Sequence, residues 1–91
     1  MRIRLLYELR SSPYGQSSDD VKFYRDFALD FVPMVGMEIT ANGGHFTAQI
    51  QELSWNDDLM IMEAFCGCHR AKSMIDEIEE LLGEGWFLKG N

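Results

Sequence analysis

The stretch from Val35 to Cys66 restricts the fold of this chain more than any other part of it. Short runs there alternate apolar and polar residues, which is the pattern of strands with one face in water. Asn42-Gly43-Gly44 favours a hairpin turn, because Asn and Gly accept positive φ at low cost. The sequence therefore predicts three strands joined by two turns, the strands at 37–40, 46–51 and 59–66 and the second turn at 54–58.

Further segments flank this stretch. Residues 2–10 alternate as a strand, and the apolar residues of 70–82 recur at helical spacing, with Gly83 suited to the end of the helix. Residues 21–32 are ambiguous: their aromatic alternation favours a strand, although 17–20 could cap a helix there. The last apolar run, 86–88, is a short strand or a docked tail.

The order of these elements predicts an α+β fold. We expect a bent antiparallel β-sheet, or a small partly open barrel of about five strands, with one C-terminal amphipathic helix packed on it. Ninety-one residues, 46% of them apolar, suit a single domain spanning 1–91. No apolar run is long enough to span a bilayer and no signal segment is evident, so we expect a cytoplasmic protein without membrane contact. Cys66 and Cys68 are too close to close a useful disulfide loop, so we expect them to be reduced.

Charge is unevenly distributed along the chain, whose net charge is −7. Residues 1–25 carry five basic and three acidic groups, whereas residues 26–91 carry three basic and twelve acidic groups. Such an acidic surface repels phosphate backbones, which argues against direct nucleic-acid binding. It suits a partner protein with a basic surface, although charge that serves only solubility is the simpler alternative.

The predicted helix places its acids unusually. Its carboxylates occupy the middle and C-terminal turns, while Arg70 and Lys72 stand at its start, which opposes the helix macrodipole. A helix that keeps this mismatch could hold its acids for a partner. Tyr14, in the loop 11–20, and Trp55, in a turn, are large side chains of the kind that anchor interfaces. The predicted partner-binding residues are Asp57, Asp58, Asp76, Glu77, Glu79, Glu80, Tyr14 and Trp55.

The candidate metal ligands are Cys66, Cys68, His69 and His45. Thiolates and imidazoles suit zinc, but C-x-C-H is not a usual zinc spacing. Along a strand the two cysteines would point the same way and His69 the opposite way, so we expect no metal and no cofactor. A Cys-His nucleophile would require His45 to approach Cys68. We found no catalytic constellation, and the chain is not expected to be an enzyme.

The leading hypothesis is a non-enzymatic, acidic protein-binding module. One version is a small phage-type inhibitor, a nucleic-acid mimic whose carboxylates occupy a basic, nucleic-acid-binding surface of a larger protein. One alternative is a homo-oligomeric structural or assembly protein, in which edge strands pair between copies and a homodimer is the smallest form. Another is a small zinc protein that uses the Cys-Gly-Cys-His segment.

Overall fold

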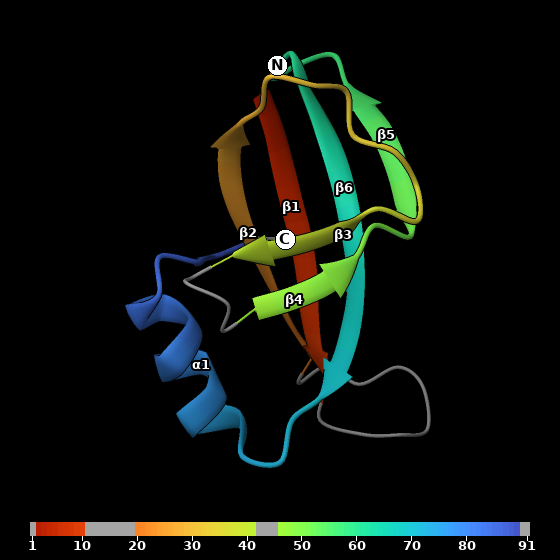
Figure 1. The fold of residues 1–91 in the computed structure, drawn as a ribbon. Helices are drawn as coiled ribbons and strands as arrows, with labels where there is room; N and C mark the ends of the chain where they lie inside the picture. The colour runs from red at the N-terminus through yellow and green to blue at the C-terminus, as the bar shows by residue number, and fades with distance from the viewer. Residues whose placement is uncertain (1, 11–19, 42–45, 90–91) are drawn as a thin grey trace.

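The structure is a computed structural model, and it describes residues 2–10, 20–41 and 46–89. Five strands form one mixed sheet in the order β5-β6-β1-β2-β7, while β3 and β4 form a separate two-stranded sheet. The elements are β1 (Arg2–Arg10), β2 (Val21–Ala28), β3 (Glu38–Ala41), β4 (Phe46–Gln49), β5 (Glu52–Asn56), β6 (Ile61–Arg70), α1 (Met74–Gly83) and β7 (Phe87–Leu88) (Figure 1). The predicted α+β fold, with about five strands in the sheet and one C-terminal helix packed on it, is confirmed. The sheet is not closed into a barrel.

The expectation of purely antiparallel pairing is wrong at the centre of the sheet. β1 pairs antiparallel with β2 but parallel with β6, where Ile3 lies opposite Met62. Sequential strands usually pair as antiparallel neighbours, which is why the sequence suggested this arrangement throughout. Here the chain leaves β2, forms the β3–β4 hairpin outside the main sheet, and returns at the edge strand β5. The turn into β6 then reverses its direction, so β6 runs the same way as β1.

The predicted strand at 21–32 is confirmed for Val21–Ala28, and the helical alternative for that segment is wrong. The turn predicted at 54–58 is also wrong. Residues 52–56 are strand β5, in which Trp55 lies opposite Met62, and the turn occupies 57–60. Asn56 stabilises this turn, because its side-chain Oδ1 accepts a hydrogen bond from the backbone N–H of Leu59 at 3.1 Å.

Strand β6 continues past Cys66, where the predicted strand ended. The pairing of β1 with β6 shifts by one residue between Leu6 and Glu8, which is a β-bulge, and Gly67 has φ +97°. Only glycine adopts such a backbone conformation cheaply, so it allows β6 to extend to Arg70. The sequence predicted that the two cysteine side chains point the same way. Because of the bulge, Cys66 is buried whereas Cys68 is exposed.

One face of the sheet, which we call the inner face, carries the buried side chains of Ile3, Leu5 and Leu9. The β3–β4 hairpin crosses this face, and α1 lies beside the end of the sheet where β6 finishes (Figure 1). Met74, Ile78 and Leu81 of α1 pack against the core there. The core between these layers consists of residues that are at most 4% exposed: Ile3, Leu5, Leu9, Phe23, Ile50, Ala64, Cys66 and Trp86. We call the opposite side the outer face.

Helix α1 begins four residues later than predicted, and this removes part of the macrodipole mismatch. Arg70 belongs to β6, and Asp76 and Glu77 fall in the first turn, where negative charge is favourable. The last turn contains no basic residue of its own. Instead, Nη1 of Arg25 on β2 donates a hydrogen bond to the carbonyl oxygen of Glu84 at 3.0 Å, which brings a positive charge to the helix C-terminus.

Candidate functional site

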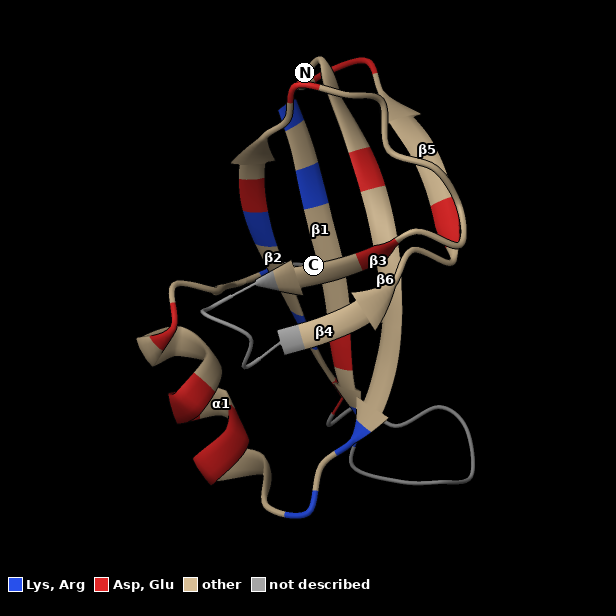
Figure 2. Cartoon of the chain, viewed as in Figure 1, with Lys and Arg blue, Asp and Glu red and all other residues tan. Residues whose placement is uncertain are grey.

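The predicted acidic residues form two separate groups. Asp57 and Asp58 lie in the turn before β6, whereas the remaining four lie on α1, which follows the far end of that strand (Figure 2). A strand of ten residues is about 30 Å long, so one flat partner surface does not easily reach both groups. The structure therefore does not assemble the single patch that the sequence suggested.

The helix group carries the more distinctive surface. Asp76, Glu79 and Glu80 are exposed, and among the described residues none of them forms an ion pair with Lys or Arg. Ile75 and Leu82 are also exposed, at 72% and 43%, and their seven-residue separation places them on one side of the helix. We call these five residues the acidic helix face. It combines two apolar side chains with three unneutralised carboxylates.

Glu77 has a different, structural role. Its Oε2 accepts a hydrogen bond from the backbone N–H of Ser73 at 3.3 Å, at the start of α1. Its Oε1 lies 3.3 Å from Nε2 of His69 on β6. Glu77 therefore ties the helix start to the sheet and is less available to a partner.

A hollow of about 190 Å³ separates α1 from β1 beside the acidic helix face. Three carboxylates from Glu77, Glu80 and Glu84 line it, together with Tyr7 and His69. Burial, followed by the charge of Glu77, raises the pKa of the Tyr7 phenol, so the hydroxyl keeps its proton and can act as a hydrogen-bond donor. Acidic side chains therefore surround the hollow.

The outer face of the sheet shows a contrasting situation, because several of its charges form ion pairs. Nε and Nη2 of Arg4 donate hydrogen bonds to the two carboxylate oxygens of Asp26, at 2.8 and 3.0 Å. The hydrogen bond from Arg4 holds the pKa of Asp26 below its ordinary value, and the same bond raises the pKa of Arg4. Arg10 and Glu8 lie 3.4 Å apart. Much of the positive charge that the N-terminal segment carries is therefore compensated locally.

The two predicted aromatic anchors have different outcomes. Trp55 is 50% exposed, and its Nε1 donates a hydrogen bond to Oδ1 of Asp57 at 3.3 Å. It shares this end of the molecule with Leu59 and Met60, which are also exposed. Tyr14 lies outside the described residues.

The described residues do not assemble the zinc or nucleophile sites considered above. Cys66 and Cys68 are separated by the bulge, His69 is engaged with Glu77, and His45 lies outside the described part of the chain. Burial raises the pKa of the Cys66 thiol to about 11, so little thiolate is present at neutral pH. Over the described ranges there is no group of three or more His, Cys, Asp or Glu able to hold a metal ion.

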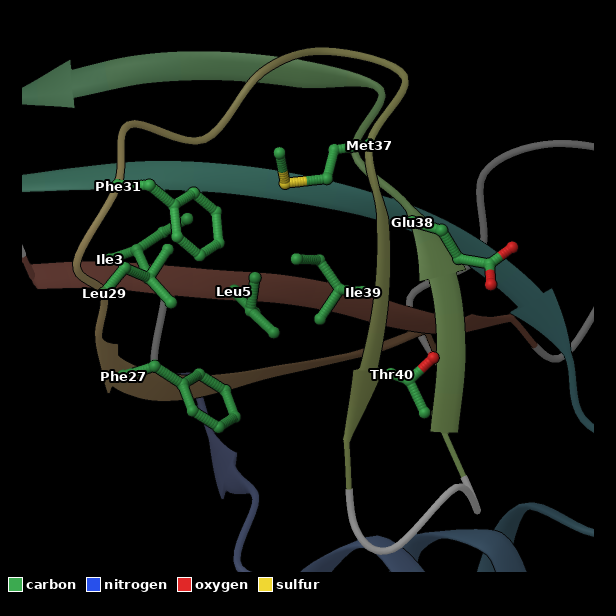
Figure 3. A pocket seen from close by; sticks show the side chains of 9 residues that line it. All are labelled: Ile3, Leu5, Phe27, Leu29, Phe31, Met37, Glu38, Ile39 and Thr40. Atoms are coloured by element: carbon green, nitrogen blue, oxygen red, sulfur yellow. The ribbon is translucent and has the colours of Figure 1, made fainter.

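Sequence reasoning missed an apolar pocket of about 270 Å³ between the inner face and β3. No local sequence signal marks it, because it exists only where the hairpin crosses the sheet. Figure 3 shows its apolar side chains converging on the side of β3 that faces away from β4, while Glu38 and Thr40 lie away from them. The main apolar lining residues are Ile3 and Leu5 on β1, Phe27 on β2, Leu29 and Phe31 after β2, and Ile39 on β3.

Comparison of the chain with protein-family models, with curated proteins and with solved structures found no match. The fold and the surfaces define the chain as a small α+β protein with an acidic helix face and an apolar pocket under a crossing hairpin. Within the described residues, no helix has the length and apolar character needed to cross a membrane.

Proposed function

We propose that this protein is a non-enzymatic binding module whose acidic helix face docks on a basic surface of a larger protein. The observation that carries the proposal is the contrast in charge pairing. Asp26 and Glu8 on the sheet are paired with arginines, whereas three carboxylates that have no such pair within the described ranges, those of Asp76, Glu79 and Glu80, gather on α1. Glu52 and Glu63 on the sheet also have no lysine or arginine partner among the described residues, but they lie on separate strands. Unpaired surface charge steers a partner of opposite sign and raises its association rate.

The exposed apolar residues on the same face support a stable complex as well as an electrostatic encounter. Ile75 and Leu82 flank Glu79 along one side of the helix. Burying such side chains contributes binding free energy, while the carboxylates around them select basic partners. The hollow that Glu80 lines beside the helix suits a lysine or arginine side chain of that partner.

The finer version of the proposal is a phage-type inhibitor that acts as a nucleic-acid mimic in the cytoplasm. The three carboxylates of the acidic helix face, from Asp76 to Glu80, span about 6 Å of helix axis, which is an average spacing of about 3 Å. One strand of B-DNA carries one phosphate per about 3.4 Å of helix axis, so the two densities of negative charge are similar. Cys66 and Cys68 are both free thiols, which supports a reducing compartment.

The proposal is tested by capturing partners from extracts of the native cell with the wild-type chain and two matched variants. Glu79→Lys/Glu80→Lys reverses two charges on α1, and Asp57→Lys/Asp58→Lys reverses two at the opposite end of β6. We expect the helix variant to lose a salt-sensitive partner that the turn variant retains. Equal capture by both variants would contradict the proposal.

A homo-oligomeric structural or assembly protein is the second candidate. The segment after β2 exposes Val32, Met34 and Val35, each at least 60% exposed, and such apolar clusters often mark contacts between proteins. Sedimentation of the purified chain at high concentration decides this candidate: a strict monomer excludes it.

A further inference from the structure

The free edge of β3 lies beside the apolar pocket. Among the described residues, β3 pairs with β4 alone. The backbone N–H of Ile50 donates to the carbonyl of Met37 at 2.9 Å, and the N–H of Gly36, which has φ +91°, donates to the carbonyl of Ile50 at 2.8 Å. This is the hydrogen-bond pattern of a β-bulge, and it sets the register from which β3 and β4 continue.

This register determines which backbone N–H and C=O groups of β3 form no hydrogen bond with β4. Antiparallel ladders alternate, so after Met37 the next residue to exchange hydrogen bonds with β4 is Ile39, opposite Ala48. The N–H and C=O groups of Glu38 and Thr40 therefore point to the other edge. Glu38 and Thr40 also line the pocket, although their side chains are exposed. Ile39 has the opposite orientation and points into the pocket (Figure 3).

We propose that this edge binds an extended peptide segment of another protein, which adds a third strand beside β3 and places one apolar side chain in the pocket. A strand that pairs with an exposed edge gains backbone hydrogen bonds, and pockets for alternate side chains select its sequence. An apolar cavity of about 150 Å³ is enough to bind benzene, so about 270 Å³ accepts an aromatic or large aliphatic side chain.

Cross-strand pairing specifies the peptide further. The peptide residue opposite Ile39 faces the same side as Ile39 and enters the pocket, because directly opposed residues share a face of the sheet. The residue opposite Glu38 lies beside that exposed carboxylate, so lysine or arginine is favoured there. The peptide therefore carries an apolar residue next to a basic one. This site uses none of the residues of the acidic helix face and does not depend on the function proposed for that face.

Two proline substitutions distinguish a loss of binding at the free edge of β3 from general damage to the β3–β4 hairpin. Thr40→Pro removes an N–H from the proposed binding edge while leaving the N–H groups that pair with β4 in place. Thr47→Pro is the matched control, because Thr47 lies opposite Thr40 and its N–H points to the outer edge of β4. Leu29→Trp fills the pocket from its wall. Thermal unfolding of each chain establishes that it is folded.

The experiment selects binders for the full chain from a displayed library of random nine-residue peptides. We expect the selected peptides to share an apolar residue beside a basic one. We expect them to bind Thr40→Pro and Leu29→Trp at least about tenfold more weakly than the wild type, and Thr47→Pro within about twofold of it. The proposal is overturned if no peptide is enriched on the wild-type chain relative to the Thr40→Pro chain. It is also overturned if the selected peptides bind the two proline variants equally.

N-methylated peptides give a second readout on the unaltered protein. Methylating the alternate amides that face β3 should weaken binding at least about tenfold, whereas methylating the intervening amides should leave it within about twofold; equal effects overturn strand addition. Self-association of the wild type that Thr40→Pro abolishes and Thr47→Pro preserves would also overturn the proposal, since a second copy would then be the occupant. Glu79→Lys/Glu80→Lys should keep peptide binding, which distinguishes this site from the acidic helix face.

Discussion

The inner face of the sheet is covered differently in its two halves. Under α1, Trp86 is 1% exposed and packs beside Tyr7, with ring centroids 6.1 Å apart, above the buried Leu9 and Phe23. Under the β3–β4 hairpin, a pocket of about 270 Å³ remains, and Phe31 on its wall is 49% exposed. The hollow between α1 and β1 is lined mostly by polar side chains, whereas the pocket under the hairpin is lined mostly by apolar ones. With respect to the apolar core, we call the two sides the filled half and the open half.

The difference follows from the geometry of the two covers. A helix presents side chains at three- and four-residue spacing, so Met74, Ile78 and Leu81 all reach the core. A four-residue strand directs only alternate side chains inward, and on β3 the residue that faces the pocket is Ile39. We therefore expect stability to come mainly from the filled half, and the binding of an extended peptide to depend on the open half.

Trp86→Ala should produce the largest effect, because it removes the largest fully buried side chain from the filled half. We expect it to lower the free energy of unfolding by about 3–5 kcal/mol, measured by urea denaturation. The matched truncation in the open half, Phe31→Ala, should cost about 1 kcal/mol or less, since half of that side chain is already in water. Equal losses would show that the two halves contribute alike.

Gly67→Ala tests the bulge that shapes β6. An alanine there adopts an unfavourable positive φ, and its Cβ would lie 2.7 Å from Nε2 of Gln51. The flexible Gln51 side chain can move away, so the expected loss of about 1–3 kcal/mol comes mainly from the backbone. Gly83→Ala in α1, which meets nothing within 4 Å, should instead stabilise the protein by about 0.5–1 kcal/mol. Urea unfolding should thus give opposite signs, and a loss at both positions would contradict this reading.

Arg25 connects the two halves, so its substitution tests whether they are coupled. Its guanidinium donates to the carbonyl of Glu84 beside the filled half and lies 5.0 Å from the ring centroid of Phe27, which lines the pocket. Arg25→Gln should lower the free energy of unfolding by about 1 kcal/mol and increase hydrogen exchange in both halves. Arg2→Gln, at a side chain that is 67% exposed, is the control and should change little. Faster exchange in the helix alone would mean that the halves are independent.

Asp26, on the outer face, provides a baseline outside both halves. Asp26→Asn should cost about 0.5–1 kcal/mol at neutral pH, because the carboxylate is partly solvated. The pKa of Asp26 in the folded protein is lowered below 3.8, so its contribution is full above that value and disappears as the pH falls through the folded pKa. Unfolding measured from pH 7 down through the folded pKa of Asp26 should therefore show the wild type and the variant converging at the acidic end. A constant difference would exclude this ion pair as the cause.

The sequence predicted the elements better than their assembly. The alternation in 2–10 and the helical spacing near the C-terminus identified β1 and α1, because each pattern is local. The parallel partner of β1 could not be predicted, since Met62 is far from Ile3 in the chain and neither residue encodes the pairing. Strand β5 was missed because Ser54 and Asn56 have turn-forming side chains, and cross-strand pairing with β6 overrode that preference.

The candidate sites divide in the same way. The acids of α1 were visible in the sequence, but their separation from Asp57 and Asp58 depends on which end of β6 each group occupies. The pocket was invisible because its walls come from three segments that meet only in the folded chain. The two cysteines were expected on one side of a strand, and the positive φ of Gly67 was enough to place them on opposite sides.

The parallel pairing of β1 with β6 bears on how the protein folds during its synthesis. A ribosome releases Ile3 long before it makes Met62, so β1 waits with one edge unpaired while most of the chain emerges. Pairings between such distant residues form slowly, and an unpaired edge recruits strands from other molecules. We therefore expect nascent chains that stop before β6 to aggregate, and complete chains to benefit from a chaperone that shields β1 until translation ends.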